Sequence, residues 1–116
     1  KFKKSYDVQV ITLEDLIQEF GVPYYVKIDV EGFELNVIKG LKSVPHFISF
    51  ESNLPEFQQE TIEIIQRLSH LSAMALFQYS VNDDGLASGK WLTAAEIIDM
   101  INNTGYRYLE IICKLK

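Results

Sequence analysis

Apolar residues recur at the three- and four-residue spacing of an amphipathic helix in several segments of the chain. Thr12 followed by Asp15, and Thr93 followed by Glu96, match the capping box that opens many helices. Gly21 follows the first of these segments, at the position where glycine commonly ends a helix. The pattern predicts helices over residues 13–20, 33–41, 57–71 and 93–104.

Shorter segments between the helices are rich in β-branched and aromatic residues, which favour strands. They predict strands over residues 8–11, 24–30, 47–51, 73–81 and 106–115. The last strand alternates, with one face formed by Leu109, Ile111, Cys113 and Leu115, and is therefore expected to be half buried. Two strands joined through a helix pair in parallel by a right-handed crossover, so the order of elements predicts an α/β fold.

Composition and charge narrow the class of protein. The chain has 116 residues, of which 47% are hydrophobic and 23% charged, as in one ordinary globular domain. Its formal net charge of −5 favours neither a nucleic-acid partner nor an anionic membrane surface. No apolar run approaches the ~20 residues of a membrane span. The single cysteine, Cys113, cannot form an internal disulfide, so we expect a buried thiol in a reducing compartment, the cytoplasm.

The stretch Lys27-Ile28-Asp29-Val30-Glu31-Gly32 carries the candidate chemistry. Alternation places Lys27 and Asp29 on the same side of a strand that we expect to be buried on both faces. Ligands of open parallel sheets bind beyond the carboxyl ends of the strands, where Asp29, Glu31 and, one strand over, Glu51 are expected. Such carboxylates can ligate magnesium, bind a polar ligand or act as a general base, and the spacing leaves these roles open. The simpler reading is a solvated strand end at which Gly32 serves only the turn.

Other reactive side chains lack a pattern of this kind. His46 and His70 have no neighbour with the spacing of a metal ligand, and the sequence contains neither a glycine-rich phosphate loop nor paired cysteines. In the leading hypothesis we therefore assign no residue of the chain as a metal ligand.

Four runs of residues are shared with a known family, and the run from Lys27 to Gly32 is the most specific of them. The runs are Val10-Ile11-Thr12-Leu13-Glu14-Asp15-Leu16, Val26-Lys27-Ile28-Asp29-Val30-Glu31-Gly32-Phe33-Glu34, Val37-Ile38-Lys39-Gly40 and Ile48-Ser49-Phe50-Glu51. They resemble the downstream half of the FkbM family of S-adenosylmethionine-dependent methyltransferases.

This resemblance implies part of a class I methyltransferase fold: a Rossmann-like sheet with flanking helices, an antiparallel last strand and the cofactor across the carboxyl edge. Residues 1–116 are then a single domain, the C-terminal portion of a methyltransferase domain, and supply the third to the seventh strand. The cofactor is S-adenosylmethionine, and the reaction is O-methylation of a sugar or another hydroxylated small molecule.

The resemblance also assigns residues. Asp29 lies nearest the reacting centre with Glu31 as its support, and Asp29, Gly32 and Glu51 contact the cofactor. The glycine-rich loop that follows the first strand of the template has no counterpart in residues 1–116. We therefore expect the 116-residue chain to be inactive by itself.

Two other functions fit the same residues. The first is a non-catalytic α/β interaction module that keeps the sheet and lacks the cofactor loop. The second is a magnesium-dependent hydrolase that uses Asp29, Glu31 and Glu51.

The template also predicts an interaction. Its fourth strand, residues 24–30 here, pairs with the first strand, which this chain lacks, so one edge of residues 24–30 is left without a partner. Either the strand at 8–11 covers that edge or two copies of the chain pair there. We expect the second arrangement, a homodimer whose contact lies next to Asp29.

Overall fold

A computed structural model describes residues 12–30, 32–81 and 89–116. Helices and strands alternate, which confirms the predicted α/β fold. In chain order the elements are α1 (Leu13–Phe20), β1 (Tyr25–Ile28), α2 (Glu34–Lys39), β2 (Phe47–Asn53), α3 (Gln58–Leu71), β3 (Leu76–Ser80), α4 (Ala94–Asn103) and β4 (Tyr108–Lys114). The predicted strand at 8–11 falls outside the described residues.

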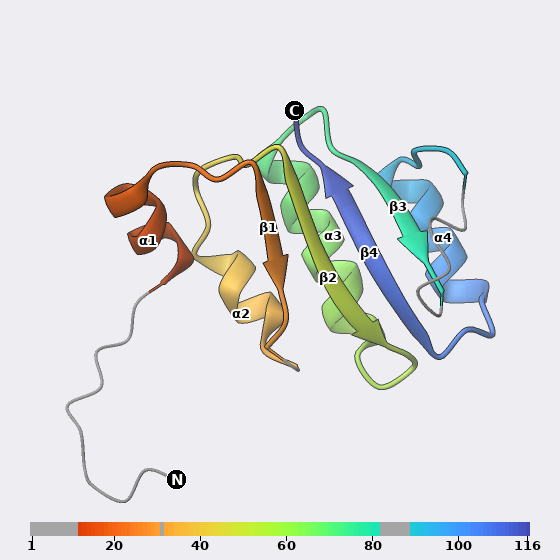
Figure 1. Cartoon of the computed structure of the whole chain (residues 1–116). Coiled ribbons are helices and arrows are strands. Elements are labelled where there is room, and N and C mark those ends of the chain that lie inside the picture. Colours follow the sequence, from red (N-terminus) through yellow and green to blue (C-terminus); the bar gives the residue numbers. More distant parts are fainter. Residues whose placement is uncertain (1–11, 31, 82–88) are drawn as a thin grey trace, which may run out of the picture.

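The four strands form one sheet in the order β1-β2-β4-β3 (Figure 1). β1 and β2 are parallel, as a strand, helix and strand in succession require. β4 lies between β2 and β3 and is antiparallel to both, which confirms the antiparallel last strand. This arrangement is compatible with part of a methyltransferase fold.

Local sequence signals explain where the two capped helices begin. At α1 the Thr12 hydroxyl accepts the backbone N–H of Asp15 at 3.0 Å, and the Asp15 carboxylate accepts the N–H of Thr12. At α4 Thr93 and Glu96 make the same pair of bonds. Both predicted capping boxes are therefore confirmed.

The hydrophobic core lies between the sheet and helices on one of its faces. In Figure 1, α3 and α4 lie behind the sheet, and α2 packs beside α3. Side chains from both layers are fully buried, among them Ile48, Phe50, Ile65, Leu68, Phe77, Ile97, Leu109 and Ile111. A buried hydrogen bond of 2.6 Å between the Ser52 and Thr61 hydroxyls also joins β2 to α3. No helix of the described residues covers the opposite face of the sheet.

β1 differs from its prediction, because it is not buried on both faces. Tyr25 and Lys27 are exposed, whereas Ile28 is 4% exposed and faces the core. β1 is the outer strand of the described sheet, and helices cover one face only, so its second face remains open to solvent. A lysine can therefore occupy this strand without the cost of burial.

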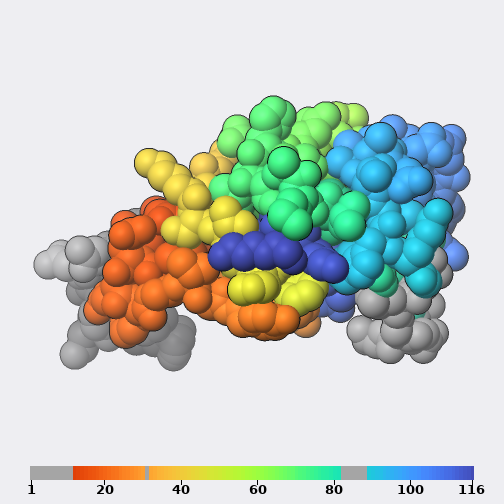
Figure 2. Space-filling view, turned by 90° about the horizontal axis from the view of Figure 1, so that it is seen from above, coloured from red at the N-terminus to blue at the C-terminus, as the bar shows by residue number. Residues whose placement is uncertain are grey.

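Figure 2 shows, from above, the end of the sheet at which β2 begins and β4 ends. The end of the chain (blue) lies between the start of β2 (yellow) and the end of α3 (green). The backbone N–H of Leu115 donates to the carbonyl of His46 at 2.8 Å, which ties this end of β4 to the entrance of β2. The carboxyl ends of β1 and β2 lie at the opposite edge of the sheet.

Candidate functional site

Two of the predicted site residues lie together at the carboxyl ends of the parallel strands. The last paired residues of β1 and β2 are Ile28 and Phe50, and Asp29 and Glu51 follow directly after them. Asp29 is exposed and Glu51 is half-buried. The prediction that Glu51 lies one strand over from Asp29 is therefore confirmed by the strand register.

A lysine lies among these carboxylates. Nζ of Lys27 is 3.5 Å from Oε2 of Glu110 on β4, and the side chains are 53% and 20% exposed. Glu110 is the register partner of Glu51, so Lys27, Glu51 and Glu110 share the face of the sheet that no described helix covers. The Glu110 charge is the main cause that raises the pKa of Lys27, and the charges of Glu51 and Asp29 add to it.

The turn after Asp29 is held in place by two side chains. Gly32 has φ of +94°, a conformation that favours glycine. Its backbone N–H donates to Oε1 of Glu34 at 2.9 Å. The Phe57 ring lies beside Gly32: its nearest atom is 3.4 Å from the position that a Cβ on Gly32 would take. Gly32 therefore serves the turn, whether or not it also touches a ligand.

Glu31 lies outside the described residues, so its predicted place at this edge stays a prediction. Sequence reasoning placed Lys27 beside Asp29 but missed Glu110, because the register between β2 and β4 joins residues about sixty positions apart. His46 stacks on Tyr24 with ring centroids 4.6 Å apart, and Nδ1 of His70 lies 3.0 Å from the carbonyl of Gln66. Both contacts are structural.

The hollow beside the site is small. It holds about 10 Å³, roughly the space of one water molecule, and is bordered by residues that include Gly32, Glu51 and Phe57. Ligand pockets commonly hold a few hundred cubic ångströms. The hollow at this edge is therefore far smaller than a ligand pocket, and Asp29 is not among the residues that border it.

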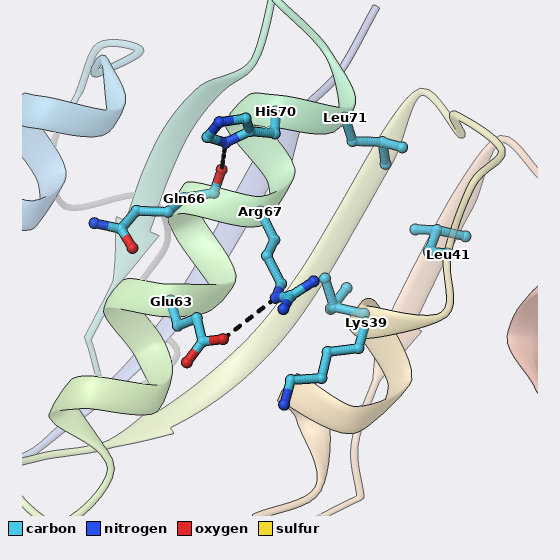
Figure 3. Close-up of a pocket in the computed structure, with 8 residues that line it drawn as sticks. Lys39, Leu41, Glu63, Gln66, Arg67, His70 and Leu71 are labelled. Atoms are coloured by element: carbon cyan, nitrogen blue, oxygen red, sulfur yellow. Dashed lines mark hydrogen bonds and ion pairs between the residues drawn. The ribbon is translucent and has the colours of Figure 1, made fainter.

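A larger hollow, of about 510 Å³, lies elsewhere, between the end of α2 and the second half of α3 (Figure 3). Arg67 in its wall pairs with Glu63, one helical turn earlier, at 3.4 Å. Lys39 and His70 stand in the last turns of α2 and α3. None of the predicted site residues borders this hollow.

The described residues contain no group of three histidine, cysteine or acidic side chains that suits a metal ion. The magnesium hypothesis combines Asp29, Glu31 and Glu51. Because Glu31 lies outside the described residues, this hypothesis stays a prediction. In the part of the chain that the structure describes, no helix is long and apolar enough to cross a membrane.

The chain is an α/β protein with acidic side chains at the carboxyl edge of a parallel strand pair, the place where open α/β sheets commonly bind ligands. The chain matches the family model for the methyltransferase FkbM domain over residues 1–108. It therefore belongs to the FkbM methyltransferase family. A search of curated proteins found no match to it.

Proposed function

We propose that this chain serves S-adenosylmethionine-dependent methyl transfer to a hydroxyl group of a small molecule such as a sugar, with Asp29 as the proton acceptor. Membership of the FkbM family supports methyl transfer in general. The observation that carries the assignment to Asp29 is its position: an exposed carboxylate one residue beyond the last rung of the parallel pair. In open α/β sheets this is where ligands bind.

The cofactor supplies a methyl group on a positively charged sulfur. The acceptor's oxygen would form a bond to the methyl carbon as the carbon–sulfur bond breaks, and the electrons of that bond would return to sulfur. Asp29 takes the proton that the hydroxyl releases, so the product is a neutral ether. Holding the acceptor in line with the methyl group supplies most of the acceleration.

The residues at the edge fit parts of such a cofactor. Asp29 and Glu51 offer carboxylate oxygens for hydroxyl or ammonium groups and negative charge near a cationic sulfur. Gly32 lacks a side chain and so allows close approach of a ligand, although its N–H is already bonded to Glu34. We assign Asp29, Gly32 and Glu51 to cofactor contacts and Glu31 to the support of Asp29.

Lys27 moderates the charge of this site. Three carboxylates, from Asp29, Glu51 and Glu110, act on its ammonium group. A cation at this place lowers the electrostatic repulsion among the three carboxylates.

The proposal places the reaction in the cytoplasm, in keeping with one cysteine that is buried within β4. The 116-residue chain alone should bind S-adenosylmethionine weakly or not at all in calorimetry, because it carries no glycine-rich cofactor loop. Micromolar binding by this chain would contradict the strand correspondence with the template.

Label transfer tests the function itself. The protein that carries this chain with the rest of its methyltransferase domain is incubated with methyl-labelled S-adenosylmethionine and a panel of hydroxylated small molecules. We expect label in an acceptor as a methyl ether. A folded protein that transfers no label would favour the non-catalytic module, and magnesium-dependent hydrolysis without the sulfonium donor would favour the hydrolase.

A further inference from the structure

Glu34 and Phe57 hold the turn that follows Asp29 from two sides, and neither belongs to the proposed reacting groups. Glu34 is the first residue of α2 and is only 8% exposed. Phe57 precedes α3 in sequence and is 37% exposed. Both border the small hollow at the carboxyl edge, together with Gly32 and Glu51.

The Glu34 carboxylate faces back toward the turn. A buried carboxylate is costly unless hydrogen bonds compensate for lost water. The Glu34 carboxylate accepts a hydrogen bond of 2.9 Å from the N–H of Gly32, the residue with φ of +94°. Hydrogen bonds to ionised groups are stronger than neutral ones, so this contact favours one conformation of the turn.

Phe57 supplies the second contact from the segment between β2 and α3. Its ring lies beside Gly32, with ring atoms 3.4 and 3.6 Å from the position that a Cβ on Gly32 would take, which is an ordinary van der Waals separation. The segment before it is anchored by two backbone bonds, from the N–H of Leu54 to the carbonyl of Arg107 at 2.8 Å and from the N–H of Phe57 to the carbonyl of Asn53 at 2.9 Å. The ring therefore ties the turn after β1 to the end of β2.

We infer that Glu34 and Phe57 are positioning residues that hold Gly32, so that the Asp29 carboxylate, three residues earlier, stays at the edge shared with Glu51. This inference rests on the proposed function. Such positioning matters because a catalytic group displaced by about 1 Å can lose two orders of magnitude in rate.

The test uses two readouts on one set of variants. Hydrogen exchange of the Gly32 amide, measured by NMR on the 116-residue chain, reports on the turn without any need for activity. Methyl transfer by the complete protein reports kcat and KM. Glu34→Ala removes the acceptor, Glu34→Gln keeps a carbonyl oxygen for the Gly32 N–H, and Phe57→Ala removes the ring. Glu60→Ala is the matched control, because Glu60 borders the same hollow but is exposed on α3.

Glu34→Ala and Phe57→Ala should each speed Gly32 exchange and lower kcat by about tenfold, with a smaller change in KM. Glu34→Gln should recover most of both quantities, and Glu60→Ala should change neither. Unchanged Gly32 exchange in Glu34→Ala would overturn the holding contact. Faster exchange with unchanged kcat would overturn its role in positioning Asp29. If the wild-type protein transfers no methyl group, the proposed function and the catalytic half of the inference are both overturned. The contact between Glu34 and the Gly32 N–H is tested separately, by Gly32 hydrogen exchange alone.

Discussion

At the scale of single residues, the Glu14 carboxylate accepts several hydrogen bonds outside the candidate site. It accepts the backbone N–H groups of Lys42 at 2.8 Å and Ser43 at 2.9 Å, and the Ser43 hydroxyl at 2.7 Å. The bond from Lys42 contributes most to a pKa that falls from 4.5 to about 2. Glu14 thus ties α1 to the segment after α2.

Glu14 should make stability depend on pH in acid. Its pKa is lower in the folded state, so its stabilising effect is complete above about pH 4.5 and is lost as pH falls toward about 2. In urea denaturation, Glu14→Gln should be less stable than wild type at pH 7, and the difference should shrink between these two pH values. Glu19→Gln, an exposed change on the same helix, is the control. A difference that stays constant from pH 7 to pH 2 would contradict this role.

Residues whose roles follow from local pattern could be predicted, and residues with distant partners could not. The alternation in the last strand predicted that Cys113 is buried, and the structure confirms it. This burial raises the pKa of the Cys113 thiol above its ordinary value. The bond between Glu14 and Lys42 spans 28 positions, and the pair of Lys27 and Glu110 depends on strand register. No local signal specifies such partners.

At the scale of elements, helix starts were predicted better than strand ends. The capping boxes are local hydrogen-bonding patterns, and α1 begins and ends where the sequence indicated. The strand predicted over 24–30 is shorter, Tyr25–Ile28, because it ends where its pairing with β2 ends. The strand predicted over 47–51 extends to Asn53, because β4 pairs with it along its whole length.

The cap of α4 offers a prediction at this scale. Thr93→Ala removes the hydroxyl that accepts the Glu96 N–H, and should cost about 1 kcal/mol of unfolding free energy. Thr93→Ser keeps the hydroxyl and should remain close to wild type. Chemical denaturation of the three proteins compares them directly, and an alanine variant as stable as the serine variant would show that the cap adds nothing.

At the scale of the whole molecule, one strand edge of the described sheet has no partner. β1 pairs with β2 on one side, and no strand of the described residues pairs on the other. The carbonyl of Tyr24 accepts the N–H of Phe47, so the N–H of Tyr25, in the same peptide group, points away from β2. Such an edge recruits another strand.

The predicted homodimer follows from this edge. Light scattering of the 116-residue chain over a tenfold concentration range should show a mass that rises from 13.4 kDa toward twice that value. Tyr25→Pro removes the outward N–H while leaving the β2 side intact, and should shift the protein toward monomer. A mass of 13.4 kDa at every concentration would exclude the dimer.

The parallel pairing and the antiparallel last strand could be expected from the order of elements and the family template. The open face of the sheet could not, because it depends on which elements pack together rather than on the pattern within any one of them. The wrong prediction that β1 is buried on both faces has this origin.

Asp29→Asn most directly tests the account, because it removes the charge of the proposed proton acceptor and nearly preserves its size. In the complete protein, kcat for methyl transfer should fall by at least about tenfold, or about 1.4 kcal/mol of barrier, while the fold is retained. Asp99→Asn, the same change at an exposed position on α4, should leave kcat unaltered. Turnover in Asp29→Asn equal to that of wild type would contradict the central claim and leave Asp29 a structural role only.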